Sequence, residues 1–308
     1  LCKKSFRSGR LVKIWLQTLF YSVGIMAVLM LPIPGGHFRP MMHEALTAVF
    51  PITMNHYWFM TAYVIMVLFS PLLNLAIWKL NRKQHLMVMG LLLGLFSLPK
   101  SILPVRLEFD DLGYSGLWFL VVYVIAAYLR RLREEDVDTA GTGKKAGRYF
   151  GIYLLLVAAM WILTLALGWV YDATGHLYEI QGLPMEYNFL LNIGAAVFLF
   201  LAFSHLSIRS EGFRKFIGRV SPYTLGVYLL HEHVLIRYEW PKWLFADRIG
   251  NCGILFAYWL LAILIVFTAG ILVDAIREAL FRLIGKTKAC QYWKGKLAEV
   301  DARLEICE

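Results

Sequence analysis

Long apolar runs separated by short polar segments dominate the chain. About 20 apolar residues at 1.5 Å each suffice for a helix to cross the roughly 30 Å core of a bilayer. Strands of a membrane barrel would instead be about ten residues long and alternate in polarity, which these runs do not. The pattern predicts an all-α, polytopic integral membrane helical bundle. Its eight predicted spans cover residues 11–31, 57–78, 86–103, 116–130, 150–171, 187–206, 222–237 and 253–276.

The positions of Lys and Arg orient these predicted helices. Cytoplasmic loops retain positive charge during insertion, and an N-terminus on the inside places 25 of the 31 Lys and Arg residues in the cytoplasm. An even number of helices returns the C-terminus to the same side. We therefore predict an integral membrane domain over residues 1–276 and a cytoplasmic basic tail over residues 277–308. The six outer cations are Arg39, Lys100, Arg106, Arg237, Lys242 and Arg248.

Composition agrees with the membrane assignment and narrows the partners. Hydrophobic residues make up 59% of the chain, charged residues only 17%, and the mean hydropathy is +0.60, which is more apolar than a soluble domain of this length. The net charge of +10 is divided among short loops that would face anionic headgroups. This distribution predicts membrane lipids, and no nucleic acid, as partners.

The four cysteines fit the same topology. Cys252 is alone on the predicted outer side, whereas Cys2, Cys290 and Cys307 fall on the reducing inner side. Neither a disulfide framework nor a CxxC metal site is predicted.

Three polar segments stand out between or after the apolar runs. The outer loops 32–56 and 171–187 mix His, acidic and aromatic residues, which suits either an acceptor site or ordinary connectors. The inner loop 133–148 is polar and Gly-containing, and we expect it to be mobile. Apolar residues at helical spacing in the tail predict a helix lying on the inner membrane surface. They are Trp293, Leu297, Val300 and Leu304.

The run SPYTLGVYLLHEHVLIR (221–237) places ionisable groups in a predicted span. Ser221 suits a helix N-cap, which puts His231 about 14 Å further along, near the bilayer midplane. Ionisable groups at that depth mark functional sites when they face the bundle interior, and Tyr228 shares the face of His231. The pair is therefore a candidate site, although a neutral His that packs against a neighbouring helix is an equal alternative.

The two residues after His231 point elsewhere. His233 lies about 200° around the helix from His231, so the triplet does not form one site. We expect Glu232 and His233 to approach the outer interface or to pair with Arg237. The HEH triplet also lacks the spacing of a zinc-binding HExxH motif, so no metal is predicted.

Four stretches together resemble one family. FRSGRLVKIW (6–15) is similar to the basic stretch before the third helix of membrane-bound acyltransferase family 3, whose members O-acylate sugars and other extracytoplasmic acceptors. NHYWFMTAYVIMVLFSPLLNLAIWKL (55–80) and GYSGLWFLVVYVIAAYLRR (113–131) resemble the family's two Trp-Phe helices. SPYTLGVYLLHEH (221–233) resembles its C-terminal Ser/Tyr/His segment. The resemblance spans nearly all of residues 5–276.

The resemblance implies a reaction and a set of residues. A cytoplasmic acyl-CoA, with acetyl as the expected acyl group, would donate to a hydroxyl of an extracytoplasmic carbohydrate or lipid-linked acceptor, with no bound cofactor. Arg7 and Arg10 are candidates for binding the acyl-CoA phosphates, although the positive-inside bias explains basic residues there as well. His231 and Tyr228 are catalytic candidates that would activate or orient the acceptor hydroxyl.

Two aromatic residues are candidates for the substrates. The resemblance implies that Trp58 and Trp118 stack on a sugar or line an acyl tunnel, whereas membrane interfaces attract Trp as an anchor in any case. The resemblance further implies a multi-pass protein of a bacterial cytoplasmic membrane.

One departure from the family bears on activity. The first helix of members carries an Arg or Lys about eleven residues before a His that is central to acyl transfer, and no stretch here matches the first two helices. The chain is then either a fragment of a longer member or a member without these helices. We expect residues 1–308 alone to be inactive, and the role of that His is not transferred to His231.

Two other classes remain open. A transporter, flippase or polymerase of lipid-linked glycans would also be a basic helical bundle, but such proteins show intramembrane charges along a path or internal duplication. Only Asp274 is of this kind, and it is spaced to pair with Arg277. A non-catalytic membrane scaffold is the other alternative.

Overall fold

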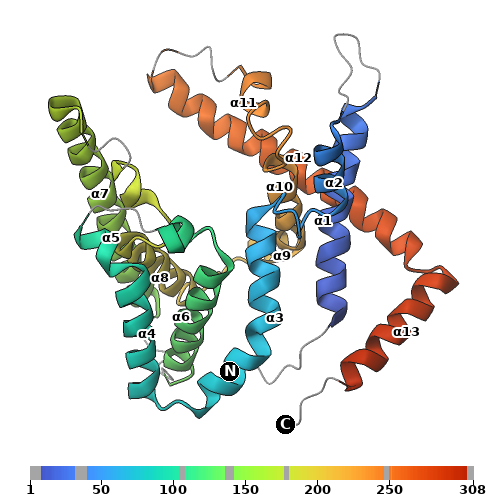
Figure 1. The fold of residues 1–308 in the computed structure, drawn as a ribbon, viewed down its shortest axis with the longest axis horizontal. Coiled ribbons are helices and arrows are strands. Elements are labelled where there is room, and N and C mark those ends of the chain that lie inside the picture. The colour runs from blue at the N-terminus through green and yellow to red at the C-terminus, as the bar shows by residue number, and fades with distance from the viewer. Residues whose placement is uncertain are drawn as a thin grey trace. The chain divides into compact units, whose positions relative to one another are not determined.

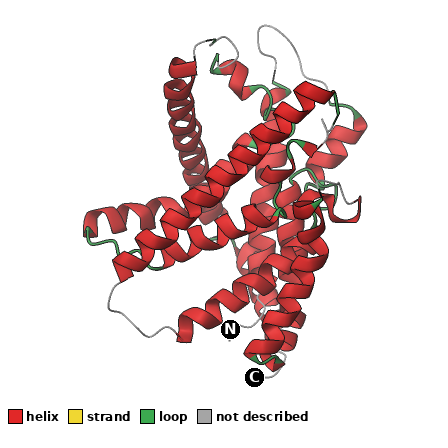
Figure 2. Cartoon of the chain, turned by 90° about the vertical axis from the view of Figure 1, so that its left-hand side faces the viewer, coloured by secondary structure: helices red, strands yellow, loops and turns green. Residues whose placement is uncertain are grey.

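The computed structural model describes residues 8–31, 40–103, 108–135, 142–176, 180–245, 250 and 252–303. Within these ranges every regular element is an α-helix or a short 3-10 helix, which confirms the all-α class (Figures 1 and 2). The chain divides into two compact units, one formed by Ile65–Arg209 and the other by Lys4–Val64 with Ser210–Glu308.

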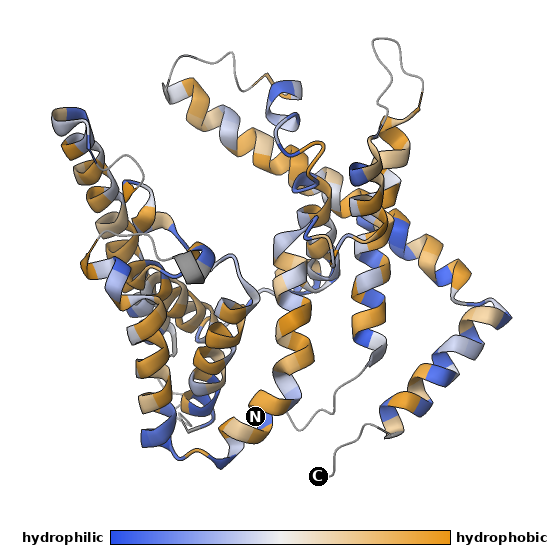
Figure 3. Ribbon diagram, in the orientation of Figure 1, coloured by the Kyte–Doolittle hydropathy of each residue, from blue (hydrophilic) through white to orange (hydrophobic). Residues whose placement is uncertain are grey.

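Five segments are long and apolar enough to span a membrane. Orange, hydrophobic stretches run along these helices in Figure 3, and many of their large side chains are exposed, such as Leu155 and Trp169 on α7. Such surfaces suit a lipid environment. The five are α1 (Ser8–Leu29), α3 (Trp58–Lys79), α7 (Thr142–Thr174), η3 (Leu183–Met185) through α8 (Leu190–Ser204), and α12 (Cys252–Ile284).

The other three predicted spans are shorter or more charged helices. The segment 86–103 is broken at Ser97 into α4 (Arg82–Phe96) and α5 (Leu98–Ile102), where Pro99 enters the second helix. The segment 116–130 lies in α6 (Gly116–Glu135), and 222–237 begins as η4 (Ser221–Tyr223) and α10 (Thr224–His231). The count of eight membrane helices and their orientation stay predictions.

The unit of residues 65–209 packs around the aromatic start of α6. Trp118 lies in a buried cluster with Phe96 of α4 and Ile193 of α8, and α7 packs along α8. A buried histidine joins two of its helices: Nε2 of His85 contacts the carbonyl oxygen of Val124 at 3.0 Å. The 3-10 helix η1 (Glu108–Gly113) precedes α6.

The second unit brings together α1, the start of α3, α10 and α12. Tyr21, Tyr57, Met60 and Leu229 form its buried cluster. α10 packs closely on α12 because Gly226 has no side chain. The space between the two helices would not hold a Cβ at this position. The shorter helices are α2 (Met42–Val49), α9 (Glu211–Val220), α11 (Trp240–Trp243) and α13 (Lys288–Arg303).

Two predicted boundaries differ from the structure. α10 ends at His231, and residues 234–239 form turns, so the predicted helix over 222–237 is wrong in its second half. Residues 142–148 form the start of α7 and are not loop; the expected mobility of 136–141 falls outside the described residues. α12 continues to Ile284, and the predicted domain end at residue 276 stays a prediction.

The predicted tail helix is present as α13. Trp293 and Val300 are exposed on it, at 65% and 45%, and the backbone N–H of Ser8 donates to Oδ1 of Asp301 at 2.6 Å. Leu304 lies outside the described residues. Its position on the inner membrane surface stays a prediction.

Candidate functional site

The C-terminal turn of α10 fixes the imidazole of His231. Nδ1 lies 2.6 Å from the carbonyl oxygen of Val227, one turn earlier. A carbonyl oxygen only accepts, so in the neutral ring Nδ1 carries the proton and Nε2 keeps its lone pair. Nε2 is 3.7 Å from Oε1 of Glu232, and the His231 side chain is 30% exposed. The ring therefore presents a basic nitrogen that is accessible and held in orientation.

Tyr228 links His231 to the start of α3. Its ring is 6.3 Å from that of His231 in an edge-to-face arrangement, 6.1 Å from Tyr57 and 5.3 Å from Phe59. Tyr57 in turn donates its hydroxyl to the carbonyl oxygen of Leu229 at 2.9 Å, which fixes the start of α3 against α10. The structure thus brings the predicted pair together on one face and places it against a third aromatic element.

His233 lies inside the unit, which corrects the expected position near the outer interface. Its side chain is fully buried because the chain leaves the helical path after His231 and turns inward. Nε2 donates to the carbonyl oxygen of Ser22 on α1 at 3.2 Å, and the backbone N–H of Leu235 donates to Nδ1 at 3.2 Å. Both ring nitrogens are satisfied, and His233 ties the end of α10 to α1.

His56 is the residue that the sequence analysis missed. Its ring centroid is 4.5 Å from that of His233, it is only 5% exposed, and neither ring nitrogen has a hydrogen-bond partner among the described residues. His56 precedes α3, outside the candidate membrane spans. Burial, with smaller effects from His233 and the charge of Arg237, lowers the pKa of His56 to about 3. The only signal in the sequence is an ionisable residue directly before an apolar run.

An ion pair beneath this group holds α1 on α12. Arg277 contacts both carboxylate oxygens of Asp274, at 2.8 and 2.9 Å, which confirms the predicted pairing. Oδ1 of Asp274 also accepts hydrogen bonds of 3.0 Å from Nε2 of Gln17 and from the hydroxyl of Tyr21. Asp274 and Arg277 are at most 2% exposed. All the strong donors nearby are paired, so this cluster is a structural tie between helices.

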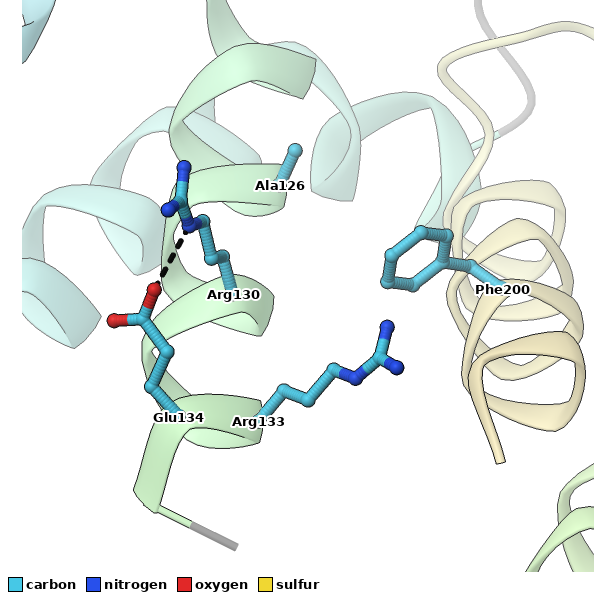
Figure 4. Close-up of a pocket in the computed structure, with 5 residues that line it drawn as sticks. All are labelled: Ala126, Arg130, Arg133, Glu134 and Phe200. Atoms are coloured by element: carbon cyan, nitrogen blue, oxygen red, sulfur yellow. Dashed lines mark hydrogen bonds and ion pairs between the residues drawn. The ribbon is translucent and has the colours of Figure 1, made fainter. Parts of the chain in front are cut away.

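A basic pocket lies at the end of α6 in the other unit. Its volume is about 550 Å³, and Ala126, Arg130, Arg133, Glu134 and Phe200 line it (Figure 4). Nε of Arg130 is 2.9 Å from Oε1 of Glu134, and this contact lowers the pKa of Glu134. Arg133 extends instead toward Phe200 on α8 (Figure 4). The pocket offers a cation beside an aromatic ring.

The remaining predicted residues are spread over the molecule. Arg10 is exposed on the first turn of α1, and Arg7 lies outside the described residues. Trp58 is partly buried beside Phe59, at 5.9 Å between rings. Trp118 is 3% exposed in the core of the other unit. Within the described ranges, no group of three or more His, Cys, Asp or Glu side chains is placed to hold a metal ion.

The comparison with protein families bears on the open classes. A family model described as an acyltransferase domain, that of acyltransferase family 3, matches residues 4–276. The chain belongs to acyltransferase family 3. Searches of curated proteins and of solved structures give no match. Membership of the family supports a membrane acyltransferase in general, and the matched region includes His231, Tyr228, His56 and Arg10.

Proposed function

We propose that this family 3 protein transfers an acyl group, acetyl in the simplest case, from cytoplasmic acyl-CoA to a hydroxyl of an extracytoplasmic glycan or lipid-linked acceptor. The setting is a bacterial cytoplasmic membrane. The observation that supports the proposal most directly is His231, whose Nδ1–H is bonded to Val227 and whose Nε2 lone pair is available.

The residues of α10 suit one part of this reaction. Nε2 of His231 accepts the proton of the acceptor hydroxyl as its oxygen attacks the thioester carbonyl. The C–S bond breaks, CoA leaves as a thiolate, and the imidazolium returns the proton to the sulfur. Glu232 holds a carboxylate oxygen 3.7 Å from Nε2, where it would attract the imidazolium while that ion exists. The ring of Tyr228 lies against His231 and limits how the acceptor approaches.

The donor would bind at basic residues on the predicted inner side. Arg10 is exposed at the start of α1, where the macrodipole adds partial positive charge, and Arg7 precedes it in the sequence. Arg133 and Phe200 in the pocket of Figure 4 offer a second place, with a guanidinium for a phosphate and a ring for the adenine. Trp58 lies closer to the α10 residues through Phe59 and suits the acceptor sugar.

The test is acyl transfer in proteoliposomes supplied with radiolabelled acetyl-CoA on the inner side. Residues 1–308 alone are expected to be inactive, since nothing in them matches the His of the family's first helix. The same residues fused behind the first two helices of an active family member are expected to label an added glycan. Failure of the well-folded fusion with every glycan and acyl donor tried would reject the proposal.

The matched control uses His205 in the fusion. Its Nδ1 also contacts the carbonyl oxygen one turn earlier, that of Leu201, at 2.9 Å, but it lies at the end of α8 in the other unit. His205→Ala should therefore leave transfer unchanged, whereas His231→Ala should not. Equal activities would remove His231 from the mechanism.

A further inference from the structure

Several buried polar groups of the second unit have no hydrogen-bond partner among the described residues. Besides both ring nitrogens of His56, the hydroxyl of Ser22 and Nε of Arg237 are enclosed and make no hydrogen bond with any described residue. Each buried donor or acceptor left unpaired costs roughly 1 to 3 kcal/mol. Native structures keep such groups rare, and a cluster of them calls for an explanation.

The three residues converge from different elements onto His233. Ser22 on α1 accepts from Nε2 of His233 through its carbonyl oxygen, and the ring of His56 stands edge to face against that of His233. Arg237 follows one turn after His233, and its backbone N–H donates to the His233 carbonyl oxygen at 2.9 Å. Ser22 and Arg237 thus contact His233 through backbone atoms and His56 contacts it through its ring, and the charge of Arg237 is near enough to His56 to lower its pKa.

The charge in this cluster is positive and comes from Arg237. The guanidinium of Arg237 lies over the ring of Tyr238, 4.6 Å from its centroid, and no carboxylate of the described residues pairs with it. Glu232 contacts His231, and Glu239 contacts Lys242 at 2.8 Å. Arg237 is partly exposed as a residue, while its Nε is enclosed. A partly buried cation without a counter-ion favours binding of an anion.

His56 adds a neutral hydrogen-bonding group to that cation. Its lowered pKa makes it a weak base at neutral pH, so it is unsuited to proton abstraction, for which a pKa near the working pH is best. A neutral imidazole offers one donor and one acceptor, which matches a sugar hydroxyl. A row of neighbouring rings connects this group to the proposed base. It runs through His56, Tyr57, Tyr228 and His231, with successive ring centroids 4.8, 6.1 and 6.3 Å apart.

We propose that His56, Ser22 and Arg237 form the recognition site for an anionic acceptor, a glycan with a carboxylate or phosphate group beside its hydroxyls. Arg237 binds the anionic group, and the imidazole of His56 and the hydroxyl of Ser22 bind hydroxyls. The inference rests on the proposed function in calling the ligand an acceptor; the binding itself is independent of catalysis.

The test follows the imidazole of His56 by NMR in the intact chain. Histidine-selective labelling in phosphatidylcholine nanodiscs gives a signal for His56, identified by its loss in His56→Gln. Glucuronate and glucose 1-phosphate are expected to shift this signal saturably, and glucose to shift it at least about tenfold more weakly, because it lacks the ion pair. Added NaCl should weaken the binding of the two anionic sugars and leave the binding of glucose unchanged.

Substitution of two different cations distinguishes binding at this site from a general effect of positive charge. Arg237→Gln should abolish the difference between glucuronate and glucose. Lys242→Gln, an outer cation already paired with Glu239, should preserve it. A His56 signal that ignores all three sugars, or that responds equally to glucose and glucuronate, overturns the proposal, as does an unchanged response in folded Arg237→Gln.

A lipid headgroup is the competing source of the same anion. Nanodiscs with phosphatidylglycerol but no sugar would then shift the His56 signal in an Arg237-dependent manner, and this result would also overturn the proposal. Acyl transfer is not part of the readout. Sugar binding by the intact chain together with a folded but inactive fusion would reject the proposed function alone. Turnover by the fusion that does not depend on Arg237 would reject the recognition site alone.

Discussion

The imidazoles of His231 and His233 are two residues apart and have opposite environments. His231 is partly exposed with Nε2 available, whereas His233 is enclosed with both nitrogens bonded. Position on a helix explains only part of this contrast, because α10 ends between them and His233 enters the unit from a turn. These surroundings suit the functional role proposed for His231 and a structural role for His233.

Substitution of the two histidines in the active fusion separates these roles. His231→Ala should lower turnover per folded molecule by about 10²- to 10⁴-fold, the usual contribution of a general base, with little change in the amount of folded protein. His233→Ala should lower stability by roughly 1 to 3 kcal/mol, because it strands the Ser22 carbonyl and the Leu235 N–H. Turnover and monodisperse yield are measured for both, and equal turnover of His231→Ala and unmodified protein would contradict the assignment.

Acid should destabilise the protein through His56. The unfolded chain binds this proton with a pKa of about 6.5, and the folded chain resists it down to about 3. Between these values the unfolded state holds more protons, so stability is complete above pH 6.5 and falls as the pH decreases toward 3.

The measurement is the Tm in detergent micelles between pH 7.5 and 4.5. His56→Gln should flatten the loss of Tm with acid, while His43→Gln, at an exposed position on α2, should leave the slope as it is. An identical slope in His56→Gln and unmodified protein would show that His56 does not titrate in this way.

The sequence predicted the pair His231 and Tyr228 because helical periodicity alone places both on one face. It could not predict His56, whose importance depends on burial by His233, a contact across 177 positions of the chain. The position of His233 was missed for a related reason: the pattern gave no sign that the helix stops at His231. Trp118 was a candidate for substrate binding on sequence grounds. Its burial depends on Phe96 and Ile193, which are distant in the sequence and pack around it in the fold.

At the scale of elements, α10 depends on its approach to α12. A Cβ at Gly226 would overlap the side chain of Asp274 and the hydroxyl of Tyr21, and one at Gly270 would overlap Val227. Small residues at both positions let the two backbones approach, as is common between membrane helices. The orientation of His231 therefore depends on residues that carry no chemistry themselves.

Gly226→Ala should destabilise the protein by about 1 to 3 kcal/mol through overpacking. Gly90 on α4 provides the matched control, since nothing lies within 4 Å of a Cβ built there. Gly90→Ala should be neutral or stabilising by up to about 1 kcal/mol from helix propensity. Thermal unfolding of both variants in micelles is compared. A similar Tm for the two would show that the interface between α10 and α12 accommodates an added methyl group.

The pair of Asp274 and Arg277 is the second tie between elements. Asp274→Ala leaves the buried guanidinium with Glu278 as its remaining carboxylate partner among the described residues and should cost up to about 3 to 5 kcal/mol, whereas the double change Asp274→Leu with Arg277→Met should cost much less. Denaturation midpoints of the single and double variants are compared. A double variant that is as unstable as Asp274→Ala would show that the charges themselves are needed there.

Helix existence was predictable at this scale, and helix ends were not. Continuous apolar runs gave α1, α3, α7, α8 and α12 because length and hydropathy suffice for a spanning helix. The break at Ser97 lies beside Pro99, which the continuous apolar run concealed, and no Gly or Pro marks the end of α10. The polar start of α7 shows that a hydrophilic segment remains helical when it continues an apolar helix.

At the scale of the whole molecule, the distribution of Lys and Arg predicts which side of the membrane each proposed substrate would approach from. The proposed reaction uses cytoplasmic acyl-CoA, so the proposed donor sites at Arg7, Arg10 and the α6 pocket would have to face inward, while the proposed acceptor residues His231 and Arg237 would need access from outside. The positive-inside pattern predicts that arrangement from sequence. It also places α13, with exposed Trp293 and Val300, on the inner membrane surface.

Cysteine accessibility tests this topology without any assay of activity. Cys252 begins α12 on the predicted outer side, and Cys290 lies on α13 on the predicted inner side. In single-cysteine variants with the other three changed to Ser, a membrane-impermeant maleimide should label Cys252 in intact cells and Cys290 only after permeabilisation. The reason is that 25 of the 31 cations resist translocation. Labelling of Cys290 from outside would invert the chain in the membrane, and with it the sides assigned to donor and acceptor.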